Sequence, residues 1–356
     1  MDVIMPKLGM TMTSGTIVQW HKQSGDMVTA GDLLCEVETD KLNSEIESDV
    51  TGILTIVAPE GEELGIGAVL GQITVIEGSE QQVAPKPRES AGSEQEKILV
   101  NGINLAVQRT GTGYPLILIH GLASSMSLWA GLDQSQLSGL QIISYDLRGH
   151  GASDRPGGAH TLAKYVADLK GLLAALDIKN AIFAGHSLGG MVAMELAASE
   201  PDMVAGLALL DTTASFPQST RDQFFELASN ASFNGMSAIA DRLLQLSFSP
   251  QFMAANPKMV ATIRKGMVTS DAASIAAAAR MVAKVELSQR LATIHCPTKV
   301  LVGAQDELAP PALSEELAKG INGAQLQIIP ESGHALPAEQ PNAVTNALVD
   351  LAKAKR

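Results

Sequence analysis

One pentapeptide of the 356-residue sequence has the spacing of an activated serine nucleophile. A short apolar stretch, 181–184, leads into Gly185-His186-Ser187-Leu188-Gly189, and a segment with helix-forming residues follows. This is the G-x-S-x-G pattern in a strand–turn–helix context, in which the glycines permit a sharp turn and the serine hydroxyl projects from the edge of a sheet. We therefore expect Ser187 to be a nucleophile. The alternative is a glycine-rich turn with an incidental serine.

A serine hydroxyl needs a general base, and the base needs a carboxylate that orients it. His334 lies in a loop after the predicted strand 326–329, where the chain order Ser, Asp, His places the base. Two aspartates satisfy the same order, Asp306 after the strand 299–303 and Asp211 at the end of the strand 207–210. We favour Asp306 as the triad acid, since Asp211 could instead cap a helix.

Backbone N–H groups should stabilise the oxyanion of the acyl-transfer transition state. One belongs to Leu188, directly after the nucleophile, and the second to Leu122, in the loop after the strand 116–119. In that loop we expect His120 to form shaping hydrogen bonds. The carboxylate and guanidinium of Asp146 and Arg148 lie two residues apart, and we interpret them as a structural turn.

A second candidate for chemistry is Lys41, near the N-terminus. It follows Glu38-Thr39-Asp40 between two predicted strands, with further acidic residues around it. At the tip of a hairpin this amine would be accessible to a modifying enzyme. The alternative is an ordinary solvated lysine that offsets its acidic neighbours, because surface ion pairs of this kind are common and weak.

The elements that must position these residues fall into two domains. Residues 1–78 carry 13 acidic and three basic residues, whereas residues 97–356 are nearly neutral. Residues 79–96 hold two prolines and almost no large apolar side chain, which is typical of a flexible linker. In residues 1–78 a pattern of glycines and apolar residues recurs 36 positions later, from Gly25 to Gly61. This repeat predicts a small all-β sandwich with approximate two-fold symmetry.

Residues 97–356 alternate apolar strand patterns with helical ones, which predicts a mostly parallel sheet with helices on both faces. Residues 214–295 break this alternation and are rich in alanine and methionine at helical spacing. We expect them to form a helical cap over the carboxyl edge of the sheet, where sites of α/β proteins lie.

Composition excludes several classes of protein. The net charge of −13 argues against binding to nucleic-acid phosphates or anionic lipids. The sequence contains no run of about 18 apolar residues, so it predicts no membrane span. The N-terminus lacks a signal-peptide pattern. The two cysteines, Cys35 and Cys296, match no metal or redox spacing. We expect a cytoplasmic protein with reduced cysteines and no metal site.

Residues 2–78 resemble the lipoyl domain of 2-oxo acid dehydrogenase complexes. The resemblance is carried by Met5-Pro6-Lys7-Leu8-Gly9-Met10-Thr11-Met12, Gly15-Thr16-Ile17, Gly25-Asp26 and Glu38-Thr39-Asp40-Lys41. It implies that Lys41 carries lipoate in amide linkage, a group carrier whose chemistry belongs to the cofactor. Related biotinyl domains flank their lysine with methionines, whereas Asp40 and Leu42 flank Lys41, so lipoate is favoured over biotin.

Residues 97–356 resemble the α/β-hydrolase superfamily, which implies fold and triad but little about substrate. The fusion to a lipoyl domain resembles the dihydrolipoamide acetyltransferase components of acetoin dehydrogenase systems. This resemblance implies transfer of an acetyl group from S-acetyl-dihydrolipoyl to coenzyme A in acetoin catabolism. It also implies three partners: a thiamine-diphosphate-dependent acetoin dehydrogenase component, a flavin-dependent dihydrolipoamide dehydrogenase and a lipoyl-attaching enzyme.

The sequence departs from the common 2-oxo acid dehydrogenase acyltransferases. It has no Asp-Gly pair and so lacks their H-x-x-x-D-G motif, and residues 79–96 are too few for their subunit-binding domain. No coenzyme A motif is recognisable. Two other functions therefore stay open: a serine thioesterase or ester hydrolase that carries a lipoyl arm, and a lipoyl carrier or scaffold with an idle hydrolase domain.

Overall fold

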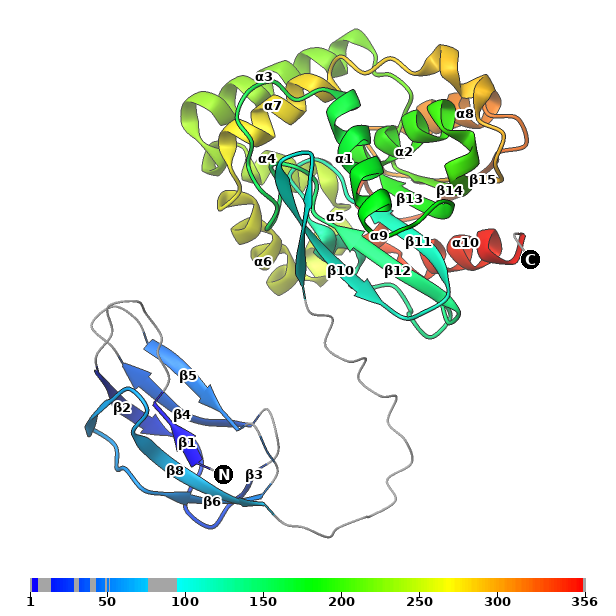
Figure 1. Cartoon of the computed structure of the whole chain (residues 1–356). Helices are drawn as coiled ribbons and strands as arrows, with labels where there is room; N and C mark the ends of the chain where they lie inside the picture. The colour runs from blue at the N-terminus through cyan, green and yellow to red at the C-terminus, as the bar shows by residue number, and fades with distance from the viewer. Residues whose placement is uncertain are drawn as a thin grey trace. The chain divides into compact units, whose positions relative to one another are not determined.

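The computed structural model describes residues 2–5, 14–28, 32–38, 43–48, 50, 52–75 and 95–354. The chain divides into two compact units, Met1–Arg88 and Glu89–Arg356, each described here by itself (Figure 1). Most of the predicted linker, residues 79–96, lies outside the described residues.

The N-terminal unit consists of two antiparallel four-stranded sheets, with the orders β1-β8-β6-β3 and β5-β4-β2-β7. Adding four to each strand number of the first sheet, and counting on from β8 to β1, gives the order of the second sheet. The two halves of the unit thus have the same topology, as the internal repeat predicts. The strands are β1 (Asp2–Ile4), β2 (Ser14–Trp20), β3 (Met27–Val28), β4 (Leu33–Glu38), β5 (Asn43–Glu47), β6 (Gly52–Ile56), β7 (Glu63–Gly65) and β8 (Val69–Val75).

Apolar side chains from both sheets form one small core, including the fully buried Ile17, Leu34 and Leu70. Gly25 and Gly61 lie in the turns before the symmetry-related strands β3 and β7, with φ angles of +100° and +85°. Glycine adopts this left-handed conformation without the strain of a side chain, which explains the glycine spacing of the repeat. The predicted all-β sandwich is confirmed.

The second unit is built on an eight-stranded sheet in the order β16-β15-β14-β13-β11-β12-β10-β9. The six strands β16, β15, β14, β13, β11 and β12 pair in parallel. At the edge beyond β12, β10 and β9 form an antiparallel hairpin that the sequence analysis missed, and β10 pairs antiparallel with β12. The strands are β9 (Glu96–Val100), β10 (Ile103–Thr110), β11 (Tyr114–Ile119), β12 (Leu140–Tyr145), β13 (Ala181–His186), β14 (Val204–Leu210), β15 (Thr298–Gly303) and β16 (Gln325–Ile329).

Helices cover both faces of this sheet. Along β13, Phe183 belongs to one buried cluster with side chains of α1, α2 and α8, while Ile182 and Ala184 belong to a second cluster with α10. Successive strand residues point to opposite faces, so a nearly continuous apolar strand fills two cores. The helices outside the cap are α1 (Leu162–Ala175), α2 (Leu188–Ser199), α8 (Pro311–Gly320), α9 (Leu336–Glu339) and α10 (Pro341–Ala354).

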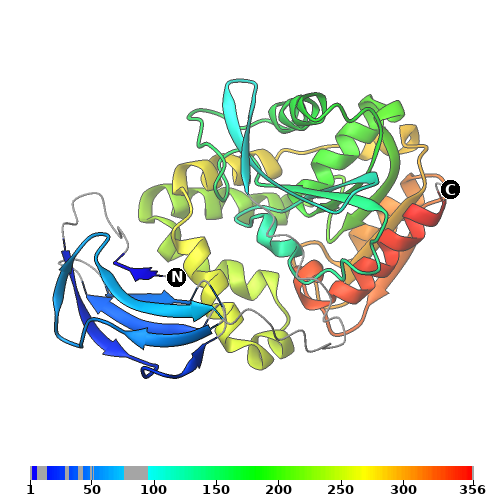
Figure 2. The same ribbon diagram turned by 60° about the horizontal axis from the view of Figure 1, so that its bottom comes forward.

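Between β14 and β15 the chain forms the cap, a group of helices at one edge of the sheet, coloured yellow-green to yellow in Figures 1 and 2. The cap helices are α3 (Gln218–Asn234), α4 (Ala240–Ser247), α5 (Pro250–Ala255), α6 (Pro257–Val268) and α7 (Ala272–Val282). The predicted fold class, a lipoyl-type sandwich plus an α/β-hydrolase fold with a helical cap, is confirmed.

The sequence analysis expects no membrane span, no metal site and reduced cysteines, and each expectation can be compared with the described residues. Among them, no helix is long and apolar enough to cross a membrane, and no group of three or more His, Cys, Asp or Glu side chains could hold a metal ion. Cys35 is buried and Cys296 half-buried, and both thiols are free. Burial raises the pKa of Cys35 to about 12, so this thiol is an inert part of the core.

Candidate active site

Ser187 occupies a strained turn between β13 and α2. Its φ and ψ angles are 52° and −118°, a conformation that residues other than glycine rarely adopt. A Cβ atom added to Gly185 would lie 2.4 Å from the carbonyl oxygen of Gly189, and one added to Gly189 would lie 2.1 Å from that of Ile119. The flanking glycines therefore allow the close approach of strand, turn and helix that projects Ser187 from the sheet edge.

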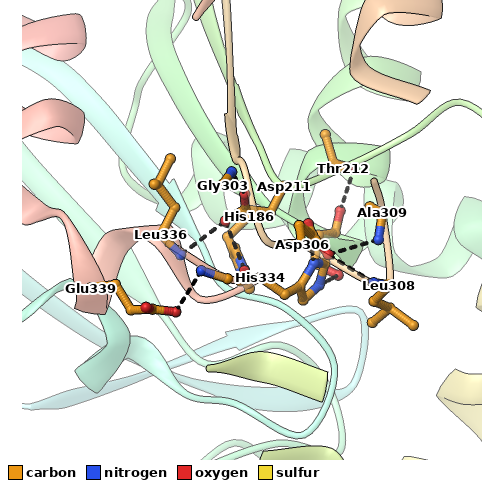
Figure 3. A network of polar contacts seen from close by, with 12 residues as sticks. His186, Asp211, Thr212, Gly303, Asp306, Leu308, Ala309, His334, Leu336 and Glu339 are labelled. Atoms are coloured by element: carbon orange, nitrogen blue, oxygen red, sulfur yellow. Dashed lines mark hydrogen bonds and ion pairs between the residues drawn. The ribbon is translucent and has the colours of Figure 1, made fainter. Parts of the chain in front are cut away.

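The structure brings the three predicted triad side chains into one hydrogen-bonded chain. His334 Nε2 lies 2.9 Å from Ser187 Oγ, and His334 Nδ1 lies 2.8 Å from Asp306 Oδ2. Asp306 accepts two further hydrogen bonds at Oδ1, from the N–H groups of Leu308 and Ala309 (Figure 3). With Nδ1 donating to Asp306, Nε2 is free to accept the proton of the Ser187 hydroxyl.

Asp211, the alternative triad acid, has a different set of contacts. Its Oδ1 accepts a hydrogen bond from Gly303 N and its Oδ2 one from Leu336 N, each 2.9 Å long. The carboxylate is fully buried, and burial, reinforced by the nearby charge of Asp306, raises its pKa well above the ordinary value. Asp211 therefore ties together the loops that carry Asp306 and His334. Asp211 does not precede a helix as its N-cap residue, since Pro217 precedes α3. Its bond from Leu336 N nevertheless satisfies an N-terminal N–H group of α9, which agrees with the expected capping role.

Two further side chains hold the His334 loop, and the sequence analysis assigned neither of them. His186 Nε2 donates to the carbonyl oxygen of His334 at 2.6 Å. Glu339 Oε1 accepts from Gly333 N at 3.0 Å and from Ser249 N at 3.1 Å, and its Oε2 accepts from Ser249 Oγ at 2.5 Å. Figure 3 shows Glu339 and Leu336 beside the His334 loop. Because Ser249 precedes α5, Glu339 links the His334 loop to the cap.

The His120-Gly121-Leu122 loop approaches Ser187 closely. A Cβ atom on Gly121 would lie 3.0 Å from Ser187 Cβ. In the part of the chain that the structure describes, the N–H group of Leu122 donates to no protein acceptor. The N–H group of Leu188, at the first position of α2, has no intrahelical acceptor. Both groups are thus available to a ligand at Ser187.

His120 forms the shaping hydrogen bonds that the sequence predicts. Its Nδ1 donates to Gly121 O at 2.8 Å, and its Nε2 accepts from Leu147 N at 3.0 Å. The predicted structural turn is confirmed as well, since Asp146 accepts from the N–H groups of Met126 and Ala152, and Arg148 makes two hydrogen bonds to Asp168.

Several histidines around the site are deeply buried. Burial lowers the pKa of His120 to about 4 and the pKa values of His150 and His186 to about 3. These rings are therefore neutral at pH 7, which agrees with the acceptor role of His120 Nε2.

A cavity of about 1070 Å³ adjoins the triad, lined by Ser187, His334 and Leu122. Much of its remaining lining is apolar and comes from the cap, namely from Phe224, Leu227, Leu243, Leu246, Ile263 and Met267. Ligand pockets commonly have volumes of about 300–1,000 Å³, so this cavity has room for an extended ligand.

Lys41, the predicted site of cofactor attachment, lies outside the described residues. The strands before and after it are described: β4 and β5 pair antiparallel, and Glu38 opposite Asn43 is the last pair toward the connection. In the sequence Lys41 lies between these two paired strands.

Comparison with known proteins separates the same two regions. Residues 114–341 match the family model of the alpha/beta hydrolase fold, and residues 1–73 match that of biotin-requiring enzymes. The chain is 28% identical to the "Dihydrolipoyllysine-residue acetyltransferase component of acetoin cleaving system" of Pseudomonas putida, over 97% of this chain and 96% of that protein. The protein of the same name from Cupriavidus necator is 26% identical over 96% and 94% of the two chains.

Among solved structures, the enol-lactonase from Burkholderia xenovorans LB400 is similar to the second unit. Its TM-score is 0.70 at 29% sequence identity, and the match covers 72% of this chain and all of that chain. The two relatives from acetoin cleaving systems thus match nearly the whole of this chain, whereas the lactonase matches only 72% of it.

Proposed function

Because the chain belongs to the alpha/beta hydrolase fold family and its relatives over both units are acetoin cleaving components, we propose that it is a lipoyl-bearing acetyltransferase. It would move an acetyl group from S-acetyl-dihydrolipoyl to coenzyme A in acetoin catabolism. The observation that carries this proposal is the end-to-end match to those components together with an assembled Ser187–His334–Asp306 chain. We take residues 1–78 as the lipoyl domain, 79–96 as the linker and 97–356 as the catalytic domain.

Lys41 is the proposed attachment site of lipoate, which would supply the dithiol that presents the acetyl group as a thioester. The position of Lys41 in the sequence, between the paired strands β4 and β5, supports this proposal, because an amine between two strands of a small domain can reach both a lipoyl-attaching enzyme and distant active sites. The linker would supply this thioester to the catalytic domain at high effective concentration. Replacement of Lys41 by arginine should abolish the lipoyl mass increment of the intact protein, and a persisting increment would reject Lys41.

In the first half-reaction, His334 Nε2 accepts the proton of Ser187, and Ser187 Oγ attacks the carbonyl carbon of the thioester. The N–H groups of Leu122 and Leu188 hold the oxyanion. The carbon–sulfur bond then breaks, and His334 returns the proton to the departing sulfur. The product is acetyl-Ser187, with Asp306 keeping the ring of His334 oriented throughout.

In the second half-reaction, His334 accepts the proton of the coenzyme A thiol, and the sulfur attacks the carbonyl carbon of acetyl-Ser187. The carbon–oxygen bond to Ser187 breaks, and His334 returns the proton to Oγ. Acetyl-CoA leaves and the free enzyme is restored. The apolar lining from the cap would disfavour water, which is the competing acceptor.

The proposed partners follow from the relatives. A thiamine-diphosphate-dependent acetoin dehydrogenase component would load the acetyl group, and a flavin-dependent dihydrolipoamide dehydrogenase would reoxidise the dithiol. We place the whole system in the cytoplasm.

A serine hydrolase is the second candidate function, because the solved enol-lactonase shares the fold of the catalytic domain over its full length. The discriminating experiment supplies S-acetyl-dihydrolipoamide with and without coenzyme A and quantifies acetyl-CoA and acetate together. The transferase predicts acetyl-CoA as the main product. Acetate formed at an unchanged rate with and without coenzyme A would identify a hydrolase instead.

Variants complete this experiment. Replacement of Ser187 by alanine should lower the rate at least about a thousandfold. The matched control is Ser138→Ala, which changes an exposed serine outside the cavity and should leave the rate unchanged. Normal transfer by Ser187→Ala would rule out the acyl-enzyme. No turnover by the wild-type protein in either condition would favour a lipoyl carrier with an idle hydrolase domain.

A further inference from the structure

The cavity beside Ser187 contains two arginines that the mechanism does not use, Arg155 and Arg242. Arg242 lies on α4 of the cap, and Arg155 lies in the loop between β12 and α1. Both side chains are exposed, so they line the cavity where it meets solvent. The triad side chains come from other elements, at the carboxyl edge of the sheet.

The other arginines of residues 214–295 have protein partners. Within residues 214–295 the partnered arginines are Arg221 with Glu286, Arg264 with Asp241, Arg290 with Glu195, and Arg280 with Ser232. In residues 95–354, by contrast, Arg242 and Arg155 make no ion pair and no hydrogen bond. The pKa of Asp271 is lowered mainly by hydrogen bonding with Ser274, and the charge of Arg155 adds to this effect. Their guanidinium groups are therefore free to bind a ligand.

A planar guanidinium group with five N–H donors matches the oxygens of a phosphate group. The proposed reaction has one reactant that carries phosphates, coenzyme A, whose phosphates lie at the end remote from the thiol. The thioester arm on the lipoyl domain is uncharged. We propose that Arg155 and Arg242 form a phosphate subsite for the acyl acceptor, an inference that rests on the proposed transferase function.

The remaining polar lining agrees with this placement. The thiol would lie at Ser187 and His334, and the amide-containing arm of coenzyme A would cross the cavity past Gln223 and Asn230 of α3. Two carboxylates, Glu226 and Asp271, also line the cavity, but Asp271 already accepts a hydrogen bond from Ser274 N at the start of α7. The cavity lining thus has no excess of positive charge from these four side chains, and the phosphate subsite depends on the two arginines that have no protein partner.

A binding experiment tests the subsite without turnover. Desulfo-coenzyme A has all the phosphates but no thiol, and its Kd can be measured by calorimetry with the full chain. Arg242→Gln and Arg155→Gln should each raise the Kd about tenfold, because each removes charge-assisted hydrogen bonds to phosphate. Arg264→Gln is the matched control, since Arg264 is an exposed cap arginine paired with Asp241 outside the cavity, and its Kd should equal that of the wild type. Failure of the wild type to bind, or equal Kd values for all variants, would overturn the subsite.

A kinetic experiment identifies the phosphates as the recognised groups. Pantetheine ends in the same thiol and lacks phosphates. Arg242→Gln should raise the KM for coenzyme A about tenfold while leaving kcat and the KM for pantetheine unchanged. An equal loss with both acceptors would overturn phosphate recognition. If desulfo-coenzyme A binds as expected but the wild type releases only acetate, the transferase proposal fails while the phosphate subsite stands.

Discussion

Glu339 joins the loop of His334, the proposed general base, to the cap. Replacing Glu339 by alanine measures how strongly the function of His334 depends on that link. The carboxylate accepts three hydrogen bonds, from Gly333 N, Ser249 N and Ser249 Oγ. Gly333 directly precedes His334, so the first of these bonds restrains the backbone of the base. Glu339→Ala would leave all three donors without this acceptor.

The cost can be estimated from burial. A buried donor without a partner costs about 1–3 kcal/mol. Ser249 is buried but Glu339 is only half-buried, so water can reach part of the vacated space. Alanine also removes a carboxylate whose pKa is raised by burial, which offsets part of the loss. We therefore expect the free energy of unfolding of the catalytic domain to fall by about 2 kcal/mol.

The effect on activity should be separate from the effect on stability. A small displacement of a catalytic group can cost about 10²-fold in rate. We expect Glu339→Ala to lower kcat about 10- to 100-fold at a temperature where the variant is folded, with the KM for the thioester nearly unchanged. Glu339→Gln keeps a carbonyl acceptor for an N–H group and should recover most of the loss.

Steady-state kinetics with S-acetyl-dihydrolipoamide and thermal unfolding provide the two readouts. Glu316→Ala, at an exposed glutamate of α8, is the control and should change neither. A variant with a lowered Tm but the wild-type kcat would refute the positioning role and leave Glu339 as a support of the cap alone. Equal losses in Glu339→Ala and Glu339→Gln would show that the hydrogen-bond geometry was misjudged.

Three further predictions concern other parts of the catalytic domain. Asp306→Asn should lower kcat about 10³- to 10⁴-fold, because an amide can favour the wrong tautomer of the base, and near-normal turnover would contradict the triad. Gly189→Ala should lower the Tm strongly, since the added Cβ would meet a backbone oxygen. Gly266→Ala, in contrast, has open space on α6 and should raise the Tm slightly, because alanine favours a helix more than glycine does. Equal Tm values for the two variants would count against this reasoning. The folded-state pKa of His150, about 3, lies below the ordinary value of 6.5, so its contribution to stability is complete above pH 6.5 and is lost as pH falls toward 3. The Tm of the catalytic domain should therefore drop as the pH falls from 6.5 toward 3. The drop should be smaller in His150→Gln than in His295→Gln, the control at an exposed histidine. Identical slopes of Tm against pH in the two variants would exclude His150 as a contributor.

Much of the triad geometry could be predicted from the sequence because parallel strands end at one edge of a sheet. Ser187 follows β13, Asp306 follows β15 and His334 follows β16, so three apolar runs and the residues after them suffice to place the side chains together. The sequence favours Asp306 over Asp211, although both follow neighbouring strands. The structure agrees with this preference, because the loop after β15 brings the Asp306 carboxylate to the imidazole of His334.

The supporting contacts could not be predicted. Glu339 and Ser249 are 90 residues apart and meet only because the cap folds back on the sheet edge. The cavity has the same origin, since its lining combines strand ends with α3, α4 and α6. The β9–β10 hairpin was missed for a different reason: its strands mix exposed and buried positions at a sheet edge, which weakens the apolar pattern that marks a central strand.

The position of the cap in the chain has a consequence for how such a protein can evolve. All five cap helices are inserted between β14 and β15, which are adjacent in the sheet and paired in register from Leu207 opposite Thr298. One contiguous segment can therefore be exchanged for another without moving the strands that hold the chemistry. A chimaera that receives a foreign cap needs to preserve the junction at Ser249, where the inserted segment meets Glu339. The part of the cavity lining that the cap contributes can therefore change while the strand ends that carry Ser187, Asp306 and His334 stay in place.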